Sequence, residues 1–216
     1  MIELNRIING DCLEVMKDIP DKYFELAIVD PPYGIDILKI QNTNADSNRV
    51  SNNGYWKNYK YSEWDKYIPS VDYFKELFRV SKNQIIWGGN YFSLPPCCQW
   101  IVWNKIERNC QANGEMAWTN LKGQVKIFDM SRADAYINKM DYKFHPTQKP
   151  VALYKWLLKN YAKQGDKILD THSGSGTTAV ACIDMGFQYL CIEKDKDYYD
   201  ASVKRINKEL LKIKMF

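Results

Sequence analysis

Short apolar runs alternate along the chain with segments whose apolar residues recur every three or four positions. The run FELAIVD is continuous enough for a buried strand, whereas DCLEVMKDI before it has the spacing of a helix. VDYFKELFRVSK has helical spacing again, and NQIIWGG and WIVWNK are strand candidates. We therefore predict strand, helix and strand at 6–10, 11–19 and 24–30, and then helix, strand and strand at 71–82, 83–89 and 100–105.

The last third of the chain has the most regular pattern. Its first predicted helix opens at Pro150, and its second closes at Gly186, as proline and glycine commonly do at helix ends. A basic amphipathic helix follows the last strand. We predict helix, strand, helix and strand at 149–162, 166–170, 174–186 and 187–195. This alternation favours an α/β protein with a mostly parallel sheet, formed as a single domain over 1–216.

Two segments interrupt the alternation. Residues 35–66 are rich in Asn, Ser, Lys and aromatic residues and have no sustained period, so we predict a mobile loop that faces the substrate. Residues 105–143 are irregular and carry scattered Lys and Arg, with one predicted strand at 124–130. Such side chains suit contacts to phosphates and base edges.

Composition excludes several classes of protein. The net charge of +4 over 216 residues is too small for a histone-like polycation, although a local basic face could still meet nucleic acid. The six cysteines have neither zinc-ligand spacing nor a disulfide-framework pattern, so we expect reduced thiols. No apolar run approaches the ~20 residues of a membrane span. We expect a cytoplasmic protein with no membrane partner.

A glycine-containing loop, ILDTHSGSGTT at 168–178, leads from a predicted strand into a helix. Gly174 and Gly176 let a ligand approach the backbone, and the helix start offers free N–H groups. Glu193, at the end of the next strand, can accept both hydroxyls of a ribose. The loop predicts a nucleoside cofactor, with a tight helix entry as the alternative. A nicotinamide dinucleotide and S-adenosylmethionine both remain open at this point.

A second stretch, IVDPPYG at 28–34, could be a plain turn. Together with GDC at 10–12, IIWGGNYF at 85–92, HPTQKP at 145–150 and DTHSGSGT at 170–177, however, it resembles the amino-methylating DNA methyltransferases of the circularly permuted β class. In that class the catalytic motif precedes the cofactor motifs. The family often has Pro or Phe where Thr171 and His172 stand, and the segment available for target recognition is short here.

The resemblance implies a Rossmann-like S-adenosylmethionine-dependent methyltransferase fold, permuted in order, with a small target-recognition region at about 105–143. It implies that Asp30 and the carbonyl of Pro31 accept hydrogen bonds from the target amine. Pro32 stiffens the turn, and Tyr33 offers a face for an extruded base.

The resemblance also implies a set of cofactor-binding residues. Asp11 is equally suited to cap a helix, and His145 to pack within a loop. The implied set is Asp11, Cys12, Asp30, His145, Thr147, Gln148, Lys149, Pro150, Asp170, Ser173, Gly174, Gly176, Thr177, Thr178, Glu193 and Lys194.

The implied activity is N6-adenine methylation of duplex DNA by base flipping and direct displacement. Asp before PPY favours adenine, and N4-cytosine methylation is the alternative. Two further hypotheses are less favoured: a nicotinamide-dependent oxidoreductase, and a DNA-binding protein that has lost catalysis. The intact DPPY motif argues against the second. LPPCCQW at 94–100 resembles the Pro-Cys-Gln of carbon-5 cytosine enzymes, but Cys97 follows a later strand than expected. A homodimer and a partner restriction endonuclease are further partners that the resemblance allows.

Overall fold

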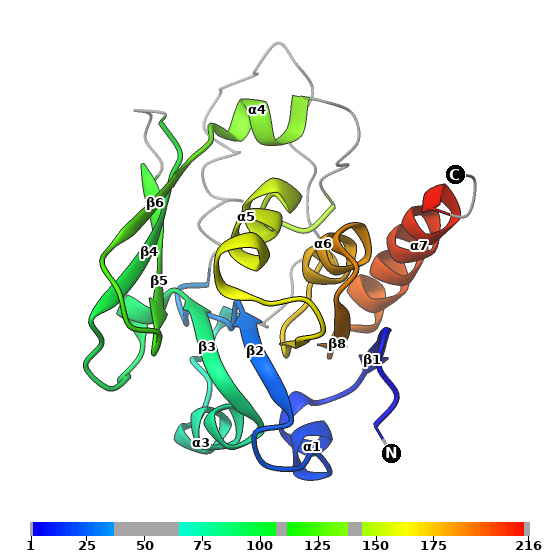
Figure 1. Ribbon diagram of the computed structural model, residues 1–216, viewed down its shortest axis with the longest axis horizontal. Helices are drawn as coiled ribbons and strands as arrows, with labels where there is room; N and C mark the ends of the chain where they lie inside the picture. The colour runs from blue at the N-terminus through cyan, green and yellow to red at the C-terminus, as the bar shows by residue number, and fades with distance from the viewer. Residues whose placement is uncertain (1, 37–64, 107–111, 138–143, 214–216) are drawn as a thin grey trace.

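The structure, a computed structural model, describes residues 2–36, 65–106, 112–137 and 144–213. Its helices and strands alternate through most of this length (Figure 1). The strands are β1 (Arg6–Asn9), β2 (Phe24–Val29), β3 (Ser81–Trp87), β4 (Gln99–Asn104), β5 (Gly114–Thr119), β6 (Lys126–Asp129), β7 (Lys167–Asp170) and β8 (Gln188–Glu193). The helices are α1 (Cys12–Lys17), α3 (Val71–Val80), the 3-10 turn η2 (Gly89–Tyr91), α4 (Arg132–Ile137), α5 (Val151–Tyr161), α6 (Thr177–Met185) and α7 (Lys196–Ile213).

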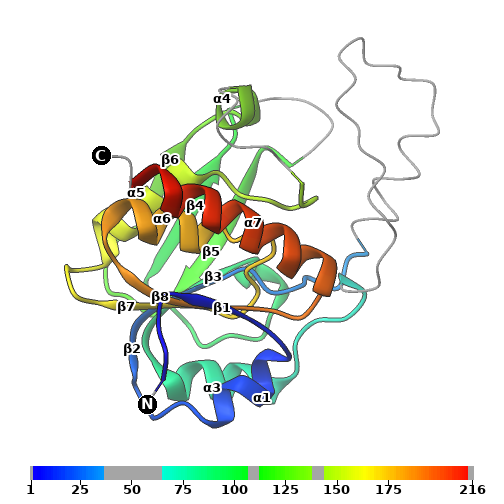
Figure 2. The same ribbon diagram turned by 90° about the vertical axis from the view of Figure 1, so that its right-hand side faces the viewer.

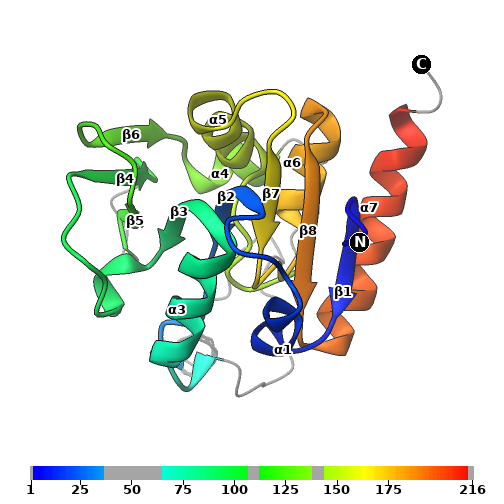
Figure 3. The same ribbon diagram turned by 60° about the horizontal axis from the view of Figure 1, so that its bottom comes forward.

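The described strands form one eight-stranded sheet in the order β1-β8-β7-β2-β3-β5-β4-β6. Strands β1, β8, β7, β2 and β3 run parallel and lie side by side in Figure 3. Neighbouring β2 and β7 are in register at Leu26 with Ile168 and Ala27 with Leu169. The carboxyl ends of these two strands therefore meet at one edge of the sheet. The acidic turn, residues 30–34 after β2, and the glycine loop, residues 171–176 after β7, meet there as well.

Helices cover both faces of the sheet (Figure 2). On one side α1 and α3 pack over a core that includes Ala27 and Val29, and on the other α5 and α6 pack over a core that includes Leu26 and Ile28. Successive residues of β2 thus enter opposite cores, as the period of two requires. Burial on both faces explains why this strand reads as a continuous apolar run.

The structure corrects the prediction between 105 and 143. Residues 114–119, predicted to be irregular, form β5, which lies between β3 and β4 and is antiparallel to both. The short helix α4 was also not predicted. GEMAWT begins with a glycine and a charged residue, and Met116 is exposed, so its pattern is too weak to identify a strand before its neighbours are known.

Other boundaries move by a few residues. The chain enters β3 at Ser81, inside the predicted helix 71–82, and the Ser81 backbone N–H donates to the carbonyl of Leu77 as it does so. Most of the predicted loop 35–66, and 107–111 and 138–143 of the predicted recognition region, lie outside the described residues. Among the described helices, none is long and apolar enough to cross a membrane.

Candidate active site

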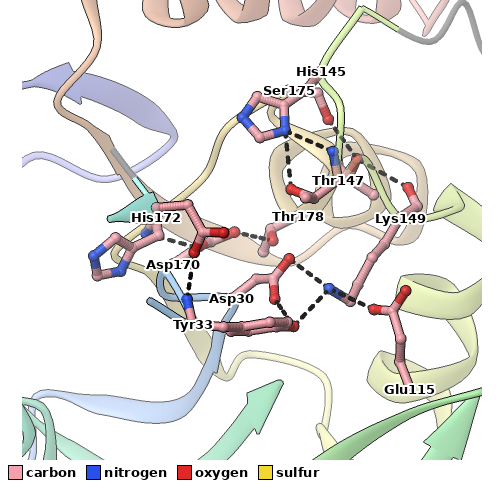
Figure 4. Close-up of polar contacts among 12 residues, drawn as sticks. Asp30, Tyr33, Glu115, His145, Thr147, Lys149, Asp170, His172, Ser175 and Thr178 are labelled. Atoms are coloured by element: carbon pink, nitrogen blue, oxygen red, sulfur yellow. Dashed lines mark hydrogen bonds and ion pairs between the residues drawn. The ribbon is translucent and has the colours of Figure 1, made fainter. Parts of the chain in front are cut away.

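The turn after β2 is held by hydrogen bonds to two carboxylates. Asp30 Oδ1 accepts from the Tyr33 hydroxyl at 2.6 Å (Figure 4). Asp65 Oδ1 accepts from the backbone N–H of Tyr33 at 2.6 Å and of Gly34 at 3.2 Å. Asp65 is itself buried. The side chain of Asp30 is therefore fixed relative to its own turn before any ligand binds.

The ring of Tyr33 is enclosed by the chain that follows β3. It stacks on Tyr91, with ring centroids 4.9 Å apart and planes 10° apart. Gly88 has a φ of +67°, and a Cβ built there would lie 2.2 Å from Cε1 of Tyr33. Part of the ring is thus already covered, while its hydroxyl faces Asp30. A stacking role for Tyr33 with an extruded base stays a prediction.

Lys149 reaches the other oxygen of Asp30. Its Nζ lies 2.5 Å from Asp30 Oδ2 and 3.1 Å from Glu115 Oε2 (Figure 4). It also faces the ring of Trp87, 5.1 Å from the ring centroid. The side chain is only 2% exposed. The ammonium group of Lys149 thus contacts the acidic turn, and the predicted place of this residue beside the cofactor stays a prediction.

The loop after β7 is built around Asp170 and Glu193. Asp170 accepts from the Thr178 hydroxyl through Oδ2 and from the backbone N–H of His172 through Oδ1. Glu193 Oε2 accepts from the backbone N–H of Gly174 at 2.7 Å. Gly174 has a φ of +50°, in the left-handed region that favours glycine.

The segment between β1 and α1 forms a third wall. Asp11 caps α1 by accepting from the backbone N–H of Leu13 at 2.9 Å, and its Oδ2 lies 3.0 Å from Lys194 Nζ. Cys12 Sγ is 3.9 Å from Nε2 of His172. Asp11 therefore has the capping role that was its alternative reading, and it faces the cavity described next.

One cavity of about 570 Å³ joins these elements, a size typical of small-molecule sites. Asp30 and the loop after β7 border it together, so the carboxyl ends of β2 and β7 open into the same space. The predicted residues on its wall are Asp11, Cys12, Asp30, Pro32, His145, Thr147, Gln148, Lys149, Asp170, Ser173, Gly174, Thr177, Glu193 and Lys194.

Five predicted residues do not line this cavity: Pro31, Tyr33, Pro150, Gly176 and Thr178. Three of them contact residues that do line it or begin the helices beside it. Pro150 and Gly176 are the N-caps of α5 and α6, and Thr178 donates to Asp170. These three residues therefore shape the cavity through the starts of α5 and α6 and through Asp170, and their predicted contact with a cofactor stays a prediction.

Sequence reasoning missed several residues of the site. Tyr73, Thr171, His172 and Tyr198 line the cavity, and the Tyr73 hydroxyl is 2.7 Å from Thr171 Oγ1. Arg205 of α7 donates to the carbonyl of Ser175 at 2.9 Å. Tyr73 and Arg205 lie on helices whose patterns signal only packing, so only the folded chain brings them to the loop.

Burial dominates the electrostatics of the cavity. It raises the pKa of Asp170 to about 7 and lowers that of His172 to about 4. It raises the pKa of Cys12 to about 12, so this thiol stays protonated. Burial also raises the pKa of Asp30, and Lys149 opposes that rise.

Comparison with known proteins identifies the family of this chain. The family model for N6 and N4 enzymes, described as DNA methylase, matches residues 97–204. The chain belongs to this family. It is also 27% identical over 254 residues to the type II methyltransferase M.HinfI of Haemophilus influenzae, an alignment that covers 94% of this chain and 68% of that protein.

Two solved structures share the fold of this DNA methylase family member. The M1.HpyAVI–SAM complex has a TM-score of 0.59 and 19% identity, over 93% of this chain and 98% of that one. The PvuII cytosine-N4-specific DNA methyltransferase has a TM-score of 0.60 and 16% identity, over 92% and 85%. The predicted methyltransferase fold is confirmed.

The two cysteines of LPPCCQW lie outside the cavity. Cys97 does not line the cavity, and its Sγ is 3.4 Å from the carbonyl oxygen of Gln99. Cys97 is half-buried and Cys98 is exposed, and neither lines the cavity, so the structure gives no support to a thiolate nucleophile.

Proposed function

We propose that this DNA methylase transfers a methyl group from S-adenosylmethionine to the N6 amine of adenine in duplex DNA. The observation that carries the proposal is the shared cavity: Asp30 after β2 and the glycine loop after β7 open into one space. A methyl donor seated against the loop can therefore face an amine held at the acidic turn.

The residues of the cavity fit the proposed donor. The Ser173 hydroxyl is buried and has no hydrogen-bond partner among the described residues, so it can bond a polar group of a ligand. Glu193 can accept ribose hydroxyls, as sequence reasoning proposed, because each carboxylate oxygen has more than one acceptor site. The resemblance assigns the methionine part to Asp170 and its loop. The positively charged sulfonium of the donor supplies an electrophilic methyl group.

Asp30 would orient the nucleophile. The lone pair of an exocyclic amine is delocalised into the base, and acceptors for both amine hydrogens localise it. Asp30 already accepts from Tyr33 and Lys149, and each of its oxygens can accept once more. The carbonyl of Pro31 is the proposed second acceptor.

The transfer is a direct displacement. The amine nitrogen forms a bond to the methyl carbon while the bond from that carbon to sulfur breaks. The electron pair of the broken bond stays on sulfur, and the nitrogen then releases one proton to solvent. The protein contributes orientation and electrostatics without a covalent bond to the base.

Adenine is proposed because Asp precedes PPY, a tendency within the resembled family, and N4-cytosine remains the second candidate. The permuted class is proposed from the chain order, in which the acidic turn precedes the glycine loop. Residues 35–66 and 105–143 are proposed to contact DNA. Lys105 is an exception, since it is buried and paired with Glu115.

The test uses DNA that lacks amine methylation. After incubation with protein and S-adenosylmethionine, the DNA is digested to nucleosides and analysed by mass spectrometry. We expect N6-methyladenine, and we expect Asp30→Ala to abolish it. N4-methylcytosine as the sole product would refute the adenine assignment, and unchanged transfer by Asp30→Ala would refute the mechanism.

A further inference from the structure

Glu115 lies on β5, the strand that the sequence did not predict, and it belongs to none of the motifs. Its Oε1 is 2.5 Å from Lys105 Nζ, and its Oε2 is 3.1 Å from Lys149 Nζ. Lys149 Nζ is in turn 2.5 Å from Asp30 Oδ2 (Figure 4). Carboxylate and ammonium groups therefore alternate through Asp30, Lys149, Glu115 and Lys105, and their charges sum to zero.

The two ammonium groups are the more deeply buried members of this quartet. The side chains of Lys149 and Lys105 are 2% and 5% exposed, against 16% for Asp30 and 26% for Glu115. A buried ammonium group needs a carboxylate partner. Glu115 partners both of them, so Lys149 does not depend on Asp30 alone.

This sharing matters for the proposed reaction. Positive charge develops on the target amine as its nitrogen bonds to the methyl group, and the negative charge of Asp30 would stabilise it. An ammonium group next to Asp30 opposes that effect. A second carboxylate on the same ammonium group offsets part of the opposition.

We propose that Glu115 is a positioning residue for methyl transfer, which holds the Lys149 ammonium group between two carboxylates and so preserves the negative charge that Asp30 presents to the target amine. The inference rests on the proposed function, since it assigns Asp30 to the amine. It adds a residue that acts through Lys149 without touching the substrate.

The charge pattern gives Glu115 a signature in the pH profile. Lys149 lowers the pKa of Asp30, whereas Glu115, a like charge, raises it. Removing Glu115 should therefore lower the pKa of Asp30 and move the acid limb of activity to lower pH. Asp30 also faces the Tyr33 hydroxyl, and Tyr154 of α5 and Asp170 after β7 lie within its electrostatic reach. None of these groups is changed by the substitution.

The decisive variant is Glu115→Gln, measured by single-turnover transfer of labelled methyl from S-adenosylmethionine to unmethylated DNA across a range of pH. We expect the plateau rate to fall about tenfold or more, as when a preorganised electrostatic contact is removed. We also expect the acid limb to move to lower pH, calorimetric binding of S-adenosylmethionine to stay unchanged, and Glu115→Asp to recover part of the rate.

The matched control is Glu76→Gln on α3. Glu76 is a similarly exposed carboxylate, at 27%, and it is paired with Arg79 at 2.7 Å. It does not line the cavity, and its variant should match the unsubstituted protein in rate and in pH profile. A general effect of losing a paired carboxylate would appear in both variants.

The outcomes separate the two proposals. If the unsubstituted protein transfers methyl and Glu115→Gln has the same rate and the same acid limb, the role of Glu115 is overturned while the proposed function stands. If the unsubstituted protein transfers no methyl, both proposals are overturned.

If Glu115→Gln does not fold, Lys105→Gln tests the role of Glu115 in its place. This variant leaves Lys149 as the remaining ion-pair partner of Glu115, so the Lys149 ammonium group should move toward Glu115 and away from Asp30. The acid limb of methyl transfer should then move to higher pH. An unchanged acid limb would overturn the proposed role of Glu115.

Discussion

Gly88 is the position where a single added methyl group, itself outside the cofactor cavity, should disable the acidic turn. A Cβ at this residue would lie 2.2 Å from Cε1 of Tyr33 and 2.6 Å from its Cδ1 and Cζ. Carbon atoms in contact prefer about 3.5–4.0 Å, so the ring would have to withdraw by roughly 1 Å. The 2.6 Å bond from the Tyr33 hydroxyl to Asp30 would then stretch beyond hydrogen-bonding distance.

The magnitude of the effect follows from that bond. A hydrogen bond to a charged group contributes about 1.5–3 kcal/mol. If Gly88→Ala loses this orientation of Asp30 in the transition state, the methyl-transfer rate should fall about ten- to a hundredfold. Binding of S-adenosylmethionine should change little, because neither Gly88 nor Tyr33 lines the cavity.

The matched control is Gly165→Ala, in the loop between α5 and β7. Gly165 also has a positive φ, +92°, but an added Cβ would meet no atom within 4 Å. Backbone strain should cost each variant about 1 kcal/mol of stability, or about 2–4 °C in Tm, and Gly88→Ala should lose more because its methyl group also displaces Tyr33. Only Gly88→Ala should lose single-turnover methyl transfer. A folded Gly88→Ala protein that transfers methyl at the unsubstituted rate would refute the reasoning.

Two further predictions concern protonation. Burial raises the pKa of Asp30, and the Lys149 ammonium group opposes that rise. Lys149→Met should therefore raise the pKa of Asp30 further and move the acid limb of methyl transfer to higher pH. A shift of the acid limb to lower pH would contradict this role of Lys149. Burial raises the pKa of Asp170 from 3.8 to about 7, so the folded state holds its proton more tightly than the unfolded state. This group should therefore cost increasing stability as pH rises from about 4 to 7, by up to about 4 kcal/mol. Asp170→Asn should flatten that dependence in chemical unfolding at pH 5 and pH 8, and an equally steep dependence in the variant would exclude Asp170 as its source.

The parts of the fold that the sequence predicted correctly are those in which local pattern and tertiary position agree. Strand β2 is buried on both faces and reads as a continuous apolar run, and α6 ends at Gly186, whose φ is +73°. Strand β5 was missed because its residues are identified as a strand only by pairing with β3 and β4. No local signal in GEMAWT encodes those partners.

The same distinction explains which site residues could be found in advance. Asp30, Asp170 and Glu193 each follow or end a strand of the parallel sheet, so a rule about strand ends reaches them. Glu115 is invisible to that rule, because it lies near the start of an antiparallel strand and reaches Asp30 only through Lys149. Asp30, Asp170 and Glu193 lie at the carboxyl edge of the sheet, where ligands bind. Glu115 lies outside that edge and is proposed to act on the charge of Asp30 through Lys149. Substitutions at Glu115 should therefore change the pH dependence and rate of transfer while leaving cofactor affinity intact, whereas substitutions at Glu193 should weaken cofactor binding first.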